Sequence, residues 1–285
     1  MGSLADGGAD NLGSCPNSAT MVSIRHPSGL GRRPFAVRVG DLAGPSLRLS
    51  SANQGRPATI CFSASASFAT AGVTAVAGAV AFKSAKGTGY GLLAVVPFLF
   101  AIQQVTEGVL WLTFDGKASL FWQTAATYFF LLVANVVWPT LVPMAVRSGE
   151  RNHQRRHFLS ALLVLGVGTS LAHGWALAAN LAVASVTGGH IAYQIQTPWS
   201  AWVVAKVAYP IVVVLPPLLA SNSALRVAGV AVLVSLIVAR VAYLETAPSV
   251  WCFFAAIVSG LVVVAVRIEA ASSPLHLESR PANPT

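Results

Sequence analysis

Residues 120–144 read LFWQTAATYFFLLVANVVWPTLVPM and contain no Asp, Glu, Lys or Arg. A helix needs about 20 consecutive apolar residues to cross about 30 Å of hydrocarbon. A helix also satisfies its own backbone polar groups, which lipid cannot do. We therefore predict that this stretch is a transmembrane helix.

Apolar runs of similar length lie on both sides of this stretch. We predict further spans at 62–82, 91–113, 158–183, 199–220, 225–244 and 250–267. The whole chain is 55% hydrophobic and only 9% charged, with a mean hydropathy of +0.67, whereas a water-soluble protein carries about 25% charged residues. The alternating pattern of a membrane barrel strand is absent. The predicted fold is an all-α, polytopic transmembrane helix bundle of about seven spans.

The distribution of basic residues predicts the orientation of the bundle. The strongest basic cluster lies between the third and fourth spans, and basic residues also occupy the loops between spans one and two and between spans five and six, and the end of span seven. These residues are Arg147, Arg151, Arg155, Arg156, Lys83, Lys86, Arg226 and Arg267. Because cytoplasmic loops are enriched in Lys and Arg, we predict an amino terminus outside and a carboxyl terminus inside, although Arg48 and Arg56 before the first span oppose this. The net charge of +9 then indicates contact with lipid headgroups and not with nucleic acid.

The two ends of the chain differ in composition from the spans. Residues 1–59 are rich in Gly, Ser, Pro and Arg without apolar periodicity, so we predict a disordered extension, with a second disordered tail at 269–285. An Arg-rich, Ser-rich and acid-poor segment also fits an organelle transit peptide, and an upstream start codon is a third interpretation. The expected location is the plasma membrane, or an organelle membrane if the extension is a transit peptide.

A group of polar residues lies inside the second predicted span. Gln103, Glu107 and Trp111 are spaced by four and Gln104 lies three before Glu107, so the two amides, the carboxyl group and the indole share one helical face. An ionisable group in hydrocarbon is costly and is a functional candidate. The carboxyl group either belongs to a ligand or proton site, or is a buried group held by the amides or by a base on another helix. Lys206 and Arg240 are the possible basic partners, unless each extends towards the headgroups.

Histidine and cysteine residues provide a second set of candidates. His173 lies in the fourth span, as a ligand or as a hydrogen-bonded core residue, and Tyr193 lies beside His190 in the outer stretch GGHIAYQI. With the predicted topology, Cys61, Cys252, His190 and Glu107 converge at the outer side. This permits a Cys61–Cys252 disulfide, a metal site of thiolate, imidazole and carboxylate ligands, or two buried cysteines with a surface histidine. No cofactor is predicted, and a metal ion is one alternative.

Several motifs in order resemble a family of bacterial multi-pass membrane proteins of unknown function. They are CFSASASF at 61–68, PFLFAIQQVTEGVLWL at 97–112, WPTLVPMA at 138–145, GHIAYQI at 189–195 and VWCFFAA at 250–256. Members of that family typically begin Met-Cys-Phe-Ser, where this sequence has Ile60 before Cys61. The resemblance implies a polytopic membrane protein and brings no activity with it.

Three functions remain as alternatives. The first is a non-enzymatic small-solute or ion pathway, or a sensor, with Glu107 at its polar centre. The second is a membrane redox or metal enzyme that uses Cys61, Glu107, His190 and Cys252. The third is a structural or assembly protein. Hydrolase and nucleotide motifs such as HExxH, GxSxG and the phosphate loop are absent from the sequence.

Overall fold

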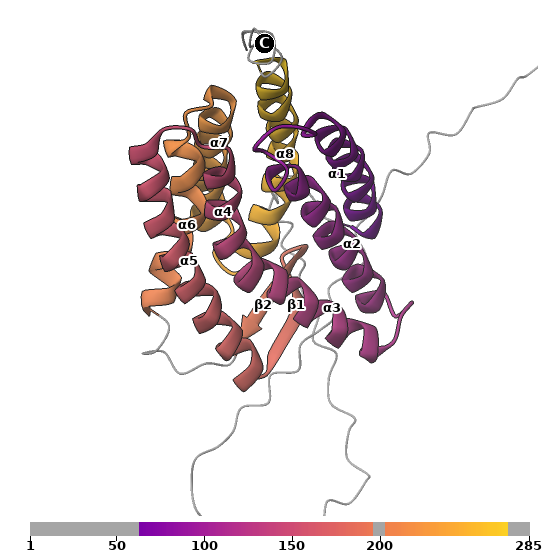
Figure 1. Cartoon of the computed structure of the whole chain (residues 1–285). Coiled ribbons are helices and arrows are strands. Elements are labelled where there is room, and N and C mark those ends of the chain that lie inside the picture. The colour runs from indigo at the N-terminus through magenta and orange to yellow at the C-terminus, as the bar shows by residue number, and fades with distance from the viewer. Residues whose placement is uncertain (1–62, 196–202, 273–285) are drawn as a thin grey trace, which may run out of the picture. The chain divides into compact units, whose positions relative to one another are not determined.

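The computed structural model describes residues 63–195 and 203–272 (Figure 1). The predicted extension at 1–59, residue Cys61 and residues 273–285 of the predicted tail lie outside the described residues.

Among the described residues, six helical segments are long and apolar enough to cross a membrane, which confirms the predicted all-α bundle. They are α1 (Ala64–Ser84), the 3-10 turn η1 (Leu93–Val95) with α2 (Val96–Phe114), the continuous α3 (Leu120–Leu132), η2 (Val133–Val137) and α4 (Trp138–Gly149), α5 (His153–Ala179), α7 (Ser223–Ala242) and α8 (Ala247–Ser272). The predicted span at 199–220 is α6 (Val203–Leu219), which is shorter and follows residues outside the description. A seventh crossing therefore stays a prediction.

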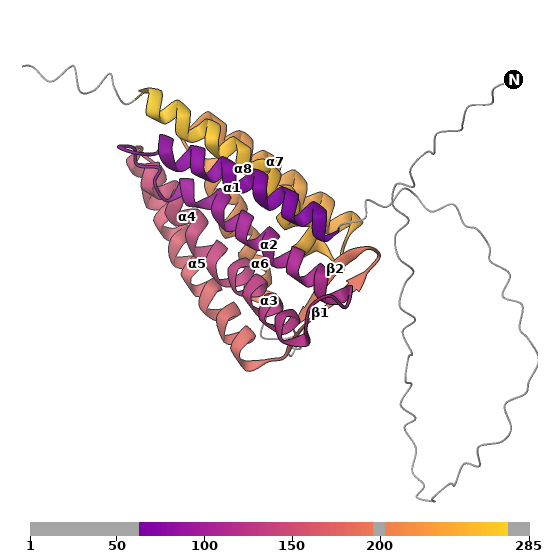
Figure 2. The same ribbon diagram turned by 90° about the vertical axis from the view of Figure 1, so that its right-hand side faces the viewer.

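Helix α2 packs against α1, α3 and α8 and has the largest buried share of the six candidate spans. Helix α1 packs along α2 and α8 (Figure 2). Glycines allow this close approach, because the ring of Phe98 lies over Gly78 and the ring of Phe68 lies over Gly108. The polar residues of α2 are therefore enclosed by protein.

The third span contains a π-helical turn immediately before Trp138 and Pro139. Proline has no backbone N–H, so the regular hydrogen-bond pattern is interrupted there. Carbonyl groups near the turn accept bonds from other helices: the Tyr209 hydroxyl donates to the Ala134 oxygen at 2.6 Å, and the Ser170 hydroxyl donates to the Val136 oxygen at 2.6 Å. These bonds attach α5 and α6 to the third span.

A two-stranded antiparallel hairpin lies between α5 and α6, formed by β1 (Ala182–Thr187) and β2 (His190–Ile195). Gly188 and Gly189 form the turn with positive φ angles of 57° and 80°, which favour glycine. The sequence analysis did not predict these strands. Its fourth span extended to residue 183, whereas α5 ends at Ala179 and the next residues enter β1.

Basic side chains join the chain segments at the opposite end of the bundle from the hairpin (Figure 1). Arg155 donates to the Leu219 oxygen, Arg226 donates to the Ala220 oxygen, and Arg151 pairs with Glu269. Helix α8, which carries Glu269, extends to Ser272, so it includes the first residues of the tail predicted at 269–285. Which end faces the cytoplasm stays a prediction.

Candidate functional site

Three polar side chains of α2 are enclosed in the core of the bundle. Gln103 and Gln104 are fully buried and Glu107 is 2% exposed. Helical spacing brings Gln104 and Glu107 onto adjacent turns, and the Gln104 Nε2 donates to Glu107 Oε2 at 3.3 Å. The Gln104 Oε1 is buried and has no hydrogen-bond partner among the described residues.

The remaining partners of Glu107 come from the hairpin and from α8. The Tyr193 hydroxyl of β2 donates to Glu107 Oε1 at 3.4 Å. The Ser249 side chain of α8 is buried and also interacts with the carboxyl group. All of these partners are neutral. Among the described residues, no Lys, Arg or His forms an ion pair with Glu107.

Tyr193 closes the hairpin side of the carboxyl site. Its ring stacks on Phe130 of α3, with centroids 4.3 Å apart and planes 1° from parallel. Burial, and secondarily the charge of Glu107, raises the pKa of Tyr193 well above its ordinary value. The phenol therefore keeps its proton and acts as a hydrogen-bond donor to the carboxyl group.

Gln103 connects this polar group with α4 and α8. The Trp138 Nε1 donates to Gln103 Oε1 at 2.7 Å, and the Gln103 Nε2 lies 3.9 Å from the Cys252 sulfur. Phe100 stacks on Trp138 with centroids 4.4 Å apart. Residues of α4, α8 and β2 therefore all contact the polar residues Gln103 and Glu107 of α2.

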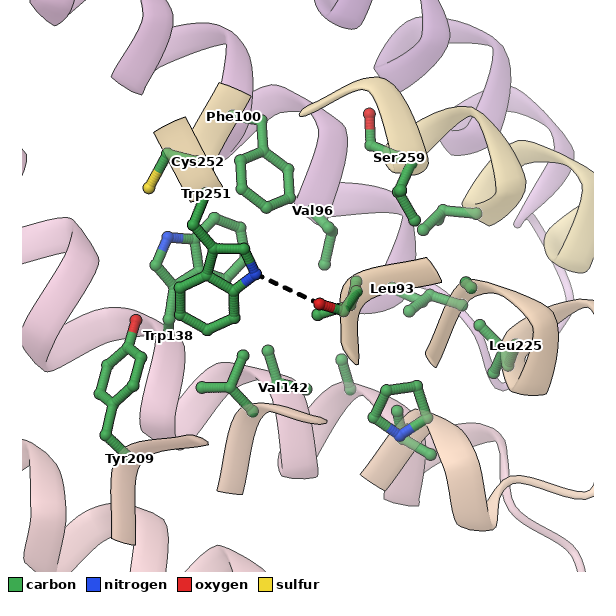
Figure 3. A pocket seen from close by; sticks show the side chains of 18 residues that line it. Leu93, Val96, Phe100, Trp138, Val142, Tyr209, Leu225, Trp251, Cys252 and Ser259 are labelled. Carbon is green, nitrogen blue, oxygen red and sulfur yellow. Dashed lines mark hydrogen bonds between the residues drawn. The ribbon is translucent and has the colours of Figure 1, made fainter. Parts of the chain in front are cut away.

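A cavity of about 100 Å³ lies beside Trp138 and Cys252 (Figure 3). Its walls come from α2, α4, α6, α7 and α8 and are almost entirely apolar. Four aromatic rings line it, those of Phe100, Trp138, Tyr209 and Trp251. The Trp251 Nε1 donates to the Val232 oxygen at 3.4 Å, so the indole polar atom is satisfied by protein. The cavity thus offers apolar and aromatic contacts to an occupant.

Three of the predicted site residues lie away from Glu107. Lys206 and Arg240 are exposed, and neither is an ion-pair partner of the carboxyl group. Trp111 packs beside Phe114 and against the hairpin instead of joining the amides. The shared face of α2 thus divides into a polar part at Gln104 and Glu107 and an apolar part at Trp111.

Both predicted histidines are buried and bond to backbone. His173 Nδ1 lies 2.9 Å from the Thr169 oxygen, and its ring contacts Tyr209. His190 Nδ1 lies 3.0 Å from the Gly188 oxygen, and its ring contacts Tyr243. Burial lowers the pKa of His190, and its hydrogen bond to Gly188 opposes this shift only in part.

The disulfide and the metal site, two of the three alternatives for the cysteines, both include Cys61, which lies outside the described residues. Cys252 is buried beside Gln103. In the ranges 63–195 and 203–272, no three His, Cys, Asp or Glu side chains gather in the manner of a metal site. The disulfide therefore stays one of the alternatives.

Two contributors were missed as site residues by the sequence analysis. Trp138 lies at a span end, where an interfacial tryptophan is ordinary, yet the structure buries it against Gln103. Ser249 carries no signal in the sequence, because a small hydroxyl residue in a membrane helix is common. Both residues were found only through their contacts with another helix, Trp138 with Gln103 and Ser249 with Glu107.

The sequence model of one protein family, described as "Family of unknown function (DUF6629)", matches residues 60–276. The chain belongs to this family. This confirms the resemblance that the motifs indicated, and the helices make this member an integral membrane protein. No curated protein and no solved structure matches the chain.

Proposed function

We propose that this protein is a non-enzymatic membrane protein that binds a proton or small cation at Glu107, as one step of an ion or small-solute pathway. The observation that carries the proposal is a buried carboxyl group whose described partners are all neutral. A carboxylate in such surroundings is unfavourable unless a positive charge neutralises it. No described side chain supplies that positive charge, so we propose that a mobile proton or cation does.

The other oxygen atoms of the site support the same proposal. The Gln104 Oε1 is buried without a described partner, and the Tyr193 and Ser249 hydroxyl groups both lie at the carboxyl group. Oxygen ligands suit a proton or a hard cation better than an anion. In the described arrangement Tyr193 covers the hairpin side, so exchange with solvent requires the hairpin to move.

Glu107→Gln is expected to reduce proton flux to the background of protein-free vesicles. The substitution keeps the size and shape of the side chain, replaces one acceptor oxygen by an amide group and removes the exchangeable charge. Purified protein in proteoliposomes, with an enclosed pH-sensitive dye and an imposed potassium diffusion potential, gives the measurement. Glu245→Gln is the matched control, because Glu245 is exposed, and it should retain the wild-type flux. Equal flux in Glu107→Gln and wild type, or a wild type no leakier than empty vesicles, would contradict the proposal.

The apolar cavity favours a second candidate, a sensor that binds a small apolar molecule. The four aromatic rings and the volume of about 100 Å³ suit a molecule of about the size of one aromatic ring. Such a molecule would lie against Trp138, which bonds to Gln103, so occupancy would be communicated to the polar site.

Iodobenzene is expected to quench tryptophan fluorescence with a saturable component, because Trp138 and Trp251 line the cavity. Ala228→Phe should remove that component by filling the cavity, since Ala228 is a buried lining residue. Val227→Phe adds a ring to the neighbouring outward-facing position and should leave the quenching unchanged. Linear, unsaturable quenching in all three proteins would exclude this candidate.

A further inference from the structure

A second pocket lies where α4 ends and α5 begins, at the end of the bundle opposite the hairpin. Its volume is about 220 Å³, and its walls are the side chains of Arg147, His153, Arg156, His157 and Ser160. It shares no residue with the cavity beside Trp138 or with the Glu107 site. The sequence analysis treated this region only as a basic loop that sets the orientation.

The side chains that line this second pocket suit an anion. Two guanidinium groups, two imidazoles and one hydroxyl line the pocket, and no carboxylate does. The nearby acid, Glu150, already accepts hydrogen bonds from Ser221 and from the Asn152 backbone. Guanidinium groups form strong, directional hydrogen bonds with phosphate oxygens. An occupant with a phosphate group therefore meets donors and no repulsive charge among the lining residues.

Local contacts hold these donors together before any ligand arrives. The Arg147 Nε donates to the Ser160 hydroxyl at 2.7 Å, and that hydroxyl donates to the Arg156 backbone oxygen at 2.8 Å. The Nε2 atoms of His153 and His157 lie 3.1 Å apart because the two residues are separated by one helical turn. The pocket is thus partly organised in advance, which lowers the entropic cost of binding.

The face of α5 that carries the histidines continues as an apolar stripe exposed on the bundle surface. Val164 and Leu171 follow His157 at intervals of seven residues, and Trp175 lies one turn further. Their side chains are 73%, 70% and 76% exposed. In an integral membrane protein these side chains face acyl chains, so a molecule with both a phosphate group and an acyl chain can contact the pocket and the stripe together. A free phosphate ion would use only the pocket.

We propose that the Arg147–Arg156 pocket binds the headgroup of an anionic phospholipid whose acyl chains lie along the exposed stripe of α5. The proposed site is a defined pocket, in contrast to the general attraction between basic loops and headgroups. It connects the ends of α4 and α5 with the adjoining bilayer leaflet.

Native mass spectrometry of the full chain, exchanged into mixed phosphatidylglycerol and phosphatidylcholine of equal chain length, tests this proposal. The wild type is expected to retain phosphatidylglycerol preferentially. Arg147→Gln/Arg156→Gln should lower that retention at least about tenfold, since each lost charge-assisted bond contributes about that factor. Lys83→Gln/Lys86→Gln removes the same charge from exposed residues outside the pocket and should retain the lipid.

The single variant Arg156→Gln controls for the possibility that the double variant loses the lipid because it misfolds. The Arg156 side chain is exposed, and the Ser160 hydroxyl bonds to its backbone oxygen and not to its guanidinium group, so Arg156→Gln should fold normally and still weaken retention. Unchanged retention in the Arg156 and double variants, or equal losses in the lysine control, would overturn the proposal. Displacement of the lipid by millimolar inorganic phosphate, with no preference between the two lipids, would assign the pocket to the free ion instead.

Discussion

Gly166→Ala is expected to destabilise the protein by about 2–4 kcal/mol. A Cβ atom at this position of α5 would lie 2.1 Å from the Pro139 backbone oxygen and 3.0 Å from its carbonyl carbon. The obstacle is backbone, so no side chain can rotate to make room, and α4 and α5 must separate. Pro139 follows Trp138, which means that the displacement reaches the hydrogen bond to Gln103.

Gly168→Ala is the matched control, because it makes the same substitution two residues further along the same helix. No atom lies within 4 Å of the position of its added Cβ. Alanine is favoured over glycine in a helix by about 1 kcal/mol, so this variant should unfold at the wild-type temperature or above it. Thermal unfolding in detergent, followed by tryptophan fluorescence, gives both values. Similar midpoints for the two variants would show that α4 and α5 are not in the close contact described.

The spans were predictable from the sequence because hydrocarbon imposes a length and a composition that few other environments require. The hairpin was not predicted, although Gly188 and Gly189 between two short runs are typical of a tight turn. The apolar residues of β1 had been added to the preceding span, since a short apolar run has no periodicity that separates strand from helix. Composition therefore located the membrane domain and missed the element that covers Glu107.

The residues of the polar site were predictable only where they share one helix. Spacing on α2 placed Gln104 beside Glu107, and the structure has that contact. The bonds from Trp138 to Gln103 and from Tyr193 to Glu107 join residues that are distant in the sequence. No local pattern specifies such partners, because they depend on how helices and the hairpin pack. The basic partners proposed for Glu107 illustrate this, since Lys206 and Arg240 are both exposed in the structure.

The partners of Glu150 were also not predictable from the sequence, where Glu150 is one acid among the arginines of a loop. In the structure its carboxylate is buried and joins the α4–α5 loop to the α6–α7 loop. Oε1 accepts from the Asn152 backbone at 2.8 Å and the Ser221 hydroxyl at 2.7 Å, and Oε2 accepts from the Ser221 backbone at 2.8 Å. Glu150→Gln should lower the free energy of unfolding by about 2 kcal/mol, because one oxygen becomes an amide group that faces a donor. Asp115→Asn makes the same change in an exposed pair and should cost less than about 1 kcal/mol.

The pH dependence separates the loss of the carboxylate from a general effect of mutation. Burial alone would raise the pKa of Glu150, but the hydrogen bonds from Ser221 and Asn152 outweigh it and hold the pKa below its ordinary value. A lowered folded-state pKa means that the unfolded chain takes up the proton first, so this stabilisation is complete above the ordinary glutamate pKa and is lost as the pH falls through the folded value. The unfolding temperature of the wild type should therefore decrease more steeply than that of Glu150→Gln as the pH falls from the ordinary glutamate pKa through the lower folded-state pKa. Parallel decreases of the unfolding temperature in the two proteins would show that the charged Glu150 carboxylate is not stabilised by its hydrogen bonds to Ser221 in the loop from α6 to α7.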